Sequence, residues 1–185
     1  MILPIYAYGQ PVLKKVAEPI DADYEGLAEL VENMWETMYN AEGVGLAAPQ
    51  IGKAIRLFVV DSKQMQEEGE EEKGIKQVFI NAEKLDETGT PWAFEEGCLS
   101  IPDVRGDVER PAELRIRYQD QHFATHEVTL TGMNARVVQH EYDHIEGKLF
   151  TEYLKPLKRR LMKRKLENIK KGKIQQRYRM RFKKQ

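Results

Sequence analysis

Cysteine is nearly absent from this chain of 185 residues: Cys98 is the only one, so no disulfide can form within the chain. No stretch approaches the 18 or so uncharged apolar residues that a membrane span requires. Residues 1–6 have neither a basic segment nor a long apolar run, so we expect no signal peptide. These absences predict a cytoplasmic protein without a membrane partner, long enough to fold as one domain around its own core.

The charges are unevenly distributed, although the net charge is only −1. Residues 151–185 contain 15 lysines and arginines against 2 acidic residues, whereas residues 1–150 contain 14 basic and 28 acidic residues. An acidic body with a basic tail predicts a polyanionic partner for the tail. The alternative is a helix that packs by its leucines and ends in a frayed cationic segment.

Hydrophobic periodicity predicts helices towards both ends of the chain and strands between them. Apolar residues recur at helical spacing over residues 24–40, with Asp21 or Asp23 as a possible N-cap. Strand-like composition or alternation occurs at residues 55–60, 77–80, 114–118 and 127–131. Strands grouped in mid-chain, with helices before and after them, favour an α+β fold with antiparallel strands.

Two further segments lie outside this pattern. Half of residues 65–74 are acidic, which predicts an exposed loop. A helix is predicted to begin near Pro156, with Gly172 at its end and a frayed basic segment over residues 175–185. The apolar face predicted for this helix consists of Leu157, Leu161, Leu166 and Ile169. We therefore expect one domain over residues 1–155, followed by a basic helix and tail over residues 156–185.

The most informative motif is His140-Glu141-Tyr142-Asp143-His144. Two histidines at positions i and i+4 of a helix lie on one face, so both imidazoles can reach one metal ion. A glutamate beside that metal can take a proton from a water molecule. We expect Asn134 to cap this helix and Gly147 to end it. The alternative is an ordinary helix with two hydrogen-bonded histidines, but the motif favours a metal-dependent hydrolase.

Two other segments contain residue types that such a site needs. Cys98 can supply a thiolate as the third metal ligand, although a lone cysteine is as often a small buried apolar residue. Residues 43–50 combine small residues with Gln50, whose amide can donate a hydrogen bond to a developing oxyanion. Taken alone, residues 43–50 could equally be a turn after the first helix.

Together, and in this order, the three segments resemble the motifs of the peptide deformylase family. They are residues 43–50 (GVGLAAPQ), 96–100 (EGCLS) and 139–144 (QHEYDH), and residues 8–13 (YGQPVL) resemble the N-terminal segment of that family. The resemblance covers about residues 1–155. It implies removal of the N-formyl group from the N-terminal methionine of nascent polypeptides, with release of formate. It also implies α+β architecture in which antiparallel or mixed sheets pack around a central metal-binding helix.

The resemblance further implies a role for each site residue. Cys98, His140 and His144 would bind one divalent metal, most typically Fe²⁺, with Zn²⁺ or Ni²⁺ able to replace it. Glu141 would act as general base and then as general acid, while the Gln50 side chain and the Leu99 N–H would stabilise the oxyanion. The C-terminal helix would contact the ribosome or its RNA. The residues expected to bind the substrate are Gly45 through its main chain, Arg105 near the cleft, and the apolar walls Val44, Phe94, Met133 and Val137.

Two other classes of protein share part of this pattern. A zinc metalloprotease has the same helix motif but needs a further Glu or His ligand, and downstream of His144 there is no histidine and few acidic residues. A non-catalytic ribosome- or RNA-binding protein with a structural metal would need a fourth protein ligand. Only His122 and His126 are left for that purpose, and neither explains Glu141.

Overall fold

The computed structural model describes residues 1–183 and has an α+β fold, which confirms the predicted fold class. The helices are α1 (Leu27–Asn40), α2 (Gly132–Ile145) and α3 (Pro156–Lys170). The strands are β1 (Ile5–Tyr6), β2 (Gly45–Ala47), β3 (Leu57–Asp61), β4 (Lys76–Thr88), β5 (Trp92–Cys98), β6 (Ile101–Arg110), β7 (Glu113–Gln119), β8 (Thr125–Thr131) and β9 (Met180–Arg181). Within residues 1–183, no helix is both long and apolar enough to cross a membrane.

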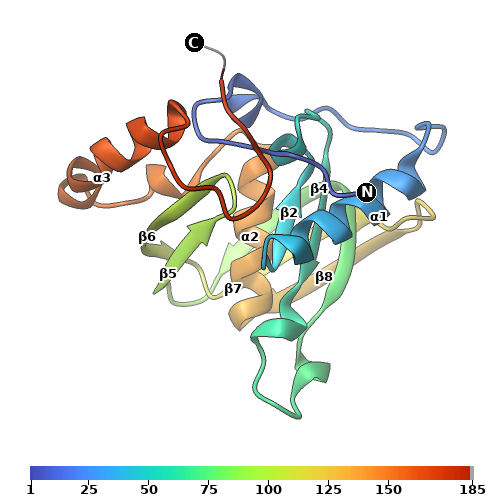
Figure 1. Cartoon of the computed structure of the whole chain (residues 1–185). Coiled ribbons are helices and arrows are strands. Elements are labelled where there is room, and N and C mark those ends of the chain that lie inside the picture. Colours follow the sequence, from blue (N-terminus) through green and yellow to red (C-terminus); the bar gives the residue numbers. More distant parts are fainter. Residues whose placement is uncertain (184–185) are drawn as a thin grey trace.

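Within the described residues 1–183, the strands form three separate sheets. The largest is antiparallel with the order β2-β3-β4-β7-β8, and β5 and β6 form an antiparallel hairpin beside it. The short strands β1 and β9 pair in parallel and so join the two ends of the chain. Helix α2 runs through the centre of the molecule, next to both the large sheet and the β5–β6 hairpin (Figure 1).

Helices α1 and α2 cover opposite faces of the large sheet. Successive residues of a strand point to opposite faces, and β3 is apolar on both. Phe58 and Val60 pack with the apolar residues of α2, whereas Leu57 and Val59 pack with those of α1. Because β3 is buried on both sides, it has a continuous apolar run instead of an alternating one. This packing fixes α2, and with it the histidine motif, against the sheet.

All three predicted helices exist, and α3 begins at Pro156 and ends just before Gly172 as predicted. The first residues of α1 and α2 differ from the prediction. Helix α1 was predicted to begin at Tyr24 with Asp21 or Asp23 as its N-cap. It begins at Leu27, and its N-cap is Gly26. Helix α2 begins at Gly132 with Thr131 as its N-cap, so the prediction that Asn134 caps it is wrong. The predicted end at Gly147 is confirmed, because α2 ends at Ile145 and Gly147 follows with a φ of 70°.

The Asn134 side chain instead connects α2 to the acidic loop. It accepts a hydrogen bond from Ser62 Oγ at 2.5 Å and donates one to the Lys73 carbonyl at 2.9 Å. These contacts hold the two ends of the loop predicted over residues 65–74, most of whose acidic side chains are exposed as expected. The prediction of an exposed loop is therefore confirmed, although the loop contains a turn of 3-10 helix at Glu71–Lys73.

The C-terminal segment differs most from the sequence-based expectation. Helix α3 packs by Met162 and Ile169 against the core under β6, whereas Leu157 and Leu161 are 70% and 71% exposed. The predicted apolar face was therefore wrong for these two leucines. After α3 the chain turns back beside the N-terminal segment (Figure 1), and β9 pairs with β1, so residues 175–183 are not frayed. Residues 184 and 185 lie outside the described part of the chain.

Candidate active site

Three potential metal ligands converge from two elements. Cys98 is the last residue of β5, and His140 and His144 lie one turn apart on α2. Their donor atoms all lie within 4.8 Å of one another, and Cys98 Sγ is 3.3 Å from His144 Nε2. One thiolate and two imidazoles at this spacing fit the three protein ligands of a catalytic metal site with one open position. The donor set and geometry therefore support a divalent metal.

Glu141 lies beside these ligands, and its carboxylate is buried. Its Oε2 atom has no hydrogen-bond partner among the described residues, and burial raises the pKa of this carboxyl to about 7. The carboxylate lies directly against Gly45 of β2, where a Cβ atom would come within 2.7 Å of Glu141 Cγ and Cδ. Only glycine leaves room for this contact. A buried carboxylate oxygen without a protein partner is suited to bind a water molecule or a substrate N–H.

The amide of Gln50 is held in one orientation. Its Oε1 accepts a hydrogen bond from the Ala47 N–H at 2.8 Å, so the amino group must point the other way. That group lies 3.4 Å from Cys98 Sγ and donates to Ser100 Oγ at 3.3 Å. Gln50 is buried in a turn of 3-10 helix at Ala48–Ile51, directly after β2. The amide N–H groups therefore point towards the ligand cluster, as an oxyanion donor requires.

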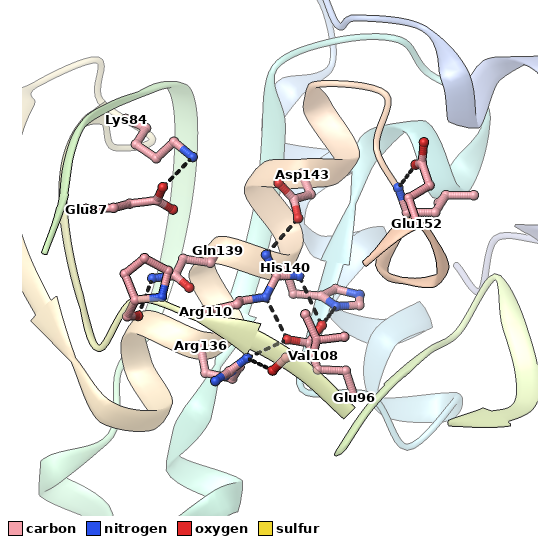
Figure 2. Close-up of polar contacts among 12 residues, drawn as sticks. Lys84, Glu87, Glu96, Val108, Arg110, Arg136, Gln139, His140, Asp143 and Glu152 are labelled. Carbon is pink, nitrogen blue, oxygen red and sulfur yellow. Dashed lines mark hydrogen bonds and ion pairs between the residues drawn. The ribbon is translucent and has the colours of Figure 1, made fainter. Parts of the chain in front are cut away.

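A buried network of charges orients the first histidine (Figure 2). Glu96 Oε2 lies 2.9 Å from His140 Nδ1, which leaves His140 Nε2 free to face the ligand cluster. The same carboxylate accepts two hydrogen bonds from Arg110, at 2.6 and 3.0 Å, and one from Arg136 at 3.1 Å. Arg110 also donates to Asp143 at 2.7 Å. Burial opposes the ionisation of Glu96, but the hydrogen bonds from His140 and Arg110 keep its pKa well below the usual range.

Sequence reasoning did not identify this network. Glu96 and Asp143 both lie inside motifs that were singled out, two residues before Cys98 and one before His144. Histidine ligands usually donate their second N–H to a carboxylate or carbonyl. An acidic residue so close to a metal ligand in the sequence could therefore have indicated such a partner. Arg110 and Arg136 lie outside the motifs. Nothing in their local sequence distinguishes them from exposed arginines.

All six predicted substrate-binding residues line one cleft of about 870 Å³, together with Gln50, Cys98, Leu99, His140 and Glu141. They are Val44, Gly45, Phe94, Arg105, Met133 and Val137. His144 is buried behind the other two ligands, with 1% of its surface exposed. The far side of the cleft has residues that no prediction included: Lys158, Met162 and Lys165 of α3, and Arg177 and Tyr178 of the C-terminal segment.

Comparison with known proteins gives a consistent result. The family model described as polypeptide deformylase matches residues 2–160. The peptide deformylase of Christiangramia forsetii is 54% identical over 189 aligned positions, which cover 98% of this chain and 96% of the relative. The peptide deformylase of Flavobacterium psychrophilum is 53% identical, and the alignment covers 98% of this chain and 97% of the relative.

Solved structures of similar chains have the same fold. The crystal structure of a peptide deformylase from Legionella pneumophila is 38% identical with a TM-score of 0.81, and the alignment covers 95% of this chain and 99% of that one. The peptide deformylase from Thermotoga maritima is also 38% identical, with a TM-score of 0.75, and the alignment covers 84% of this chain and 99% of that one. This chain is therefore longer than the Thermotoga maritima relative by roughly a sixth of its length.

Proposed function

Since this chain belongs to the peptide deformylase family and removes the N-formyl group from the N-terminal methionine of nascent polypeptides, we propose that Glu141, Gln50 and Leu99 carry out that hydrolysis. The observation that supports this assignment most strongly is the position of Glu141. This buried residue, whose Oε2 atom has no hydrogen-bond partner within residues 1–183, lines the same cleft as two of the three ligand residues, Cys98 and His140. The products are formate and a peptide with a free N-terminal amine.

Glu141 moves the proton in this proposal. Its carboxylate accepts a proton from the water that attacks the formyl carbon, and then delivers a proton to the amine that leaves. The close packing against Gly45 limits the positions that the carboxylate can adopt. One carboxyl group can serve as base and then as acid because the proton that it takes from the water is the one that it later gives to the amine.

Gln50 and Leu99 stabilise the charge that develops on the formyl oxygen. The Gln50 amide points into the site because Ala47 fixes its carbonyl end, and Leu99 follows directly after Cys98. Two preorganised N–H donors near one oxygen cost no reorganisation when negative charge forms there. Loss of one such donor typically lowers the rate by about 10²–10³-fold.

The remaining cleft residues bind the substrate. The Gly45 main chain pairs with the peptide backbone, and Arg105 lies at the cleft near the following residues of the peptide. The proposed walls of the methionine pocket are Val44, Phe94, Met133 and Val137, all of which line the cleft. An unbranched thioether adapts well to apolar walls of this kind.

Cys98, His140 and His144 bind the divalent metal in this proposal, and we propose Fe²⁺ as the native ion, with Zn²⁺ or Ni²⁺ able to replace it. Mixed thiolate and imidazole donors suit these ions better than Mg²⁺ or Ca²⁺. When bound, such a metal lowers the pKa of water and polarises the carbonyl group. Metal analysis of anaerobically purified protein decides between the ions.

The two alternative functions receive less support. Among the described residues, the group of potential metal ligands is Cys98, His140 and His144, without the downstream glutamate or histidine of a metalloprotease. The same group lacks the fourth protein ligand that a structural site usually has.

One assay tests the reaction and the role of Glu141. Anaerobically purified, metal-loaded protein is incubated with formyl-Met-Ala-Ser, and formate is measured for the wild type, Glu141→Gln and Glu146→Gln. Glu146 is the matched control, because it caps the same helix but pairs with Arg56 outside the cleft. We expect Glu141→Gln to lose about 10²–10⁴-fold in kcat and Glu146→Gln to keep its activity. Absence of formate with the fully loaded wild type would refute the reaction, and an active Glu141→Gln would refute only the role of Glu141.

We also propose that α3 contacts the ribosome or its RNA, which would bring the enzyme to nascent chains in the cytoplasm. Supporting this, Leu157, Arg160, Leu161 and Arg164 recur at helical spacing on one exposed face of α3. The opposite face packs on the core by Met162 and Ile169. Exposed arginines attract phosphate groups, and the two exposed leucines add apolar contact area.

A charge-reversal pair tests this contact without removing α3 from the core. Arg160→Glu with Arg164→Glu changes the exposed face only, and Lys53→Glu with Lys148→Glu is the control with an equal change of charge elsewhere on the surface. We expect the α3 double variant to co-sediment less with ribosomes than the wild type, and its binding to depend less on salt concentration. The control double variant should behave like the wild type. Equal binding by both pairs would contradict the proposal.

A further inference from the structure

The chain after α3 forms a strap, defined here as residues 173–182, that closes one side of the active-site cleft. Gly172 reverses the chain direction with a φ of 69°, which few other residues adopt readily. The strap then runs beside the N-terminal segment, where the Ile5 and Ala7 N–H groups donate to the Arg179 and Arg181 carbonyls at 2.9 and 3.0 Å. The strap lies beyond residue 160, where the match to the family model ends.

Apolar side chains fix the strap to the core. Ile174, Met180 and Phe182 are partly buried against the cluster that contains Ile101 and Leu13, so the strap packs beside the turn end of the β5–β6 hairpin. The Gln10 side chain adds a hydrogen bond of 3.2 Å to the Arg181 carbonyl. The strap is thus anchored on both sides of Tyr178, and the position of that residue is set by the surrounding structure.

Tyr178 connects the strap to the reaction centre. Its side chain lines the cleft, and its hydroxyl donates a hydrogen bond of 2.7 Å to the carbonyl of Leu99. Leu99 and Ser100 form the turn of the hairpin directly after Cys98. The same turn is held at its other end, where the Tyr8 N–H donates to the Ser100 carbonyl at 2.8 Å and Gln50 donates to Ser100 Oγ.

We propose that Tyr178 is a positioning residue for deformylation, which holds the Leu99–Ser100 turn so that the Leu99 N–H and the Gln50 amide face the formyl oxygen. The inference rests on the oxyanion role proposed above for Gln50 and Leu99. A tight turn has few alternative backbone conformations once the carbonyls of both its residues are hydrogen-bonded. Without the hydrogen bond from Tyr178, the peptide groups on either side of Leu99 can rotate. The Leu99 N–H then has to be reoriented towards the formyl oxygen during the reaction.

The test compares two tyrosine-to-phenylalanine variants of the full-length, metal-loaded enzyme. Tyr178→Phe removes the hydroxyl that binds Leu99, whereas Tyr39→Phe removes a hydroxyl that donates to Asp61 at 2.5 Å and does not line the cleft. For each variant kcat, KM, the thermal midpoint and the metal content are measured with formyl-Met-Ala-Ser. We expect Tyr178→Phe to lower kcat by about 2- to 10-fold, as the loss of one neutral hydrogen bond predicts, with KM and the metal content unchanged and a thermal midpoint no lower than that of Tyr39→Phe. Tyr39→Phe should keep the wild-type kcat.

Tyr178→Ala in the full-length chain provides the second measurement, because it removes the ring and the hydroxyl from the cleft wall together. Its kcat should fall at least as far as that of Tyr178→Phe. An unchanged kcat in Tyr178→Phe overturns the inference, and so does a kcat that falls only together with the metal content or with a thermal midpoint below that of Tyr39→Phe. A wild type that releases no formate refutes the proposed function itself, so the two failures are distinguishable.

Discussion

Replacing Glu96 with alanine removes the one acceptor that His140, Arg110 and Arg136 share. All four side chains are largely buried, so water cannot easily replace the lost carboxylate. Arg110 keeps its contact with Asp143, and Arg136 keeps two backbone carbonyls, those of Val108 and Trp92. His140 Nδ1 loses its partner, and the imidazole can then rotate away from the orientation that the metal needs.

The expected magnitude follows from these contacts. Removing one partner of a buried ion pair costs about 3–5 kcal/mol, and the remaining contacts of both arginines point to the lower end, about 3 kcal/mol. For a chain of this size, that loss lowers the thermal midpoint of the metal-free protein by roughly 6–12 °C. Metal affinity should also fall by about 10–100-fold, as expected when a metal-binding histidine loses its hydrogen-bond partner.

Glu127→Ala is the matched control. Glu127 also binds two arginines, Arg115 and Arg117, but all three side chains are substantially exposed, so water replaces the lost carboxylate and the thermal midpoint should change little. Thermal unfolding of the metal-free variants and competition with a chelator measure the two effects separately. A Glu96→Ala protein that unfolds at the same temperature as Glu127→Ala and keeps wild-type metal affinity would refute the reasoning.

Three further predictions follow from single contacts. Gly45→Ala places a methyl group against the Glu141 carboxylate, so kcat for formate release should fall by about 10²-fold while the metal content stays unchanged. Cys98→Ser removes the thiolate ligand, so the metal-to-protein ratio after dialysis should fall below that of the wild type. Leu154→Ala leaves a cavity over Gly106, and urea denaturation should show a loss of about 2–5 kcal/mol.

The sequence predicted the elements whose apolar pattern is regular. Helices α1 and α2 and the strands β3, β7 and β8 were predicted within a few residues of their observed bounds. Their apolar residues recur at helical spacing in the helices, alternate in β7 and β8, and form a continuous run in β3. The proposed ligands His140 and His144 were predicted because their motif states the spacing directly, and Cys98 was predicted because a thiolate suits such a metal. That all three point to one place was implied by family resemblance, since nothing local relates Cys98 to α2.

The β5–β6 hairpin was missed for a physical reason. Alternate residues of β6 are buried, but two of the inward positions are occupied by Gly106 and Arg110, so the apolar alternation is broken. The buried Glu96 has the same effect on β5. Pattern reasoning assumes that charged residues face water, and this assumption fails wherever a buried charge has a buried partner.

The strap was missed because its burial depends on distant residues. The apolar residues of the strap, Ile174, Met180 and Phe182, are isolated among basic and polar residues, and a strand of two residues such as β9 has no pattern of its own. Its pairing partner β1 lies at the other end of the chain. The buried face of α3 also depends on residues far away in the sequence. Met162 packs against the core under β6, which leaves Leu157 and Leu161 on the exposed side of the helix.

The buried charges around Glu96 are better explained by the metal site than by stability. A buried ion pair is often no more stabilising than apolar residues of the same volume, so stability alone does not account for two buried arginines and two buried carboxylates. The network joins exactly two structural units: Glu96 and Arg110 belong to the β5–β6 hairpin, while Arg136, His140 and Asp143 belong to α2. Cys98 lies on the first unit and both histidines on the second. The hydrogen bonds of Glu96 and Arg110 are directional, so they fix the distance between the Cys98 thiolate and the two imidazoles. Apolar packing between the hairpin and α2 would define this distance less closely.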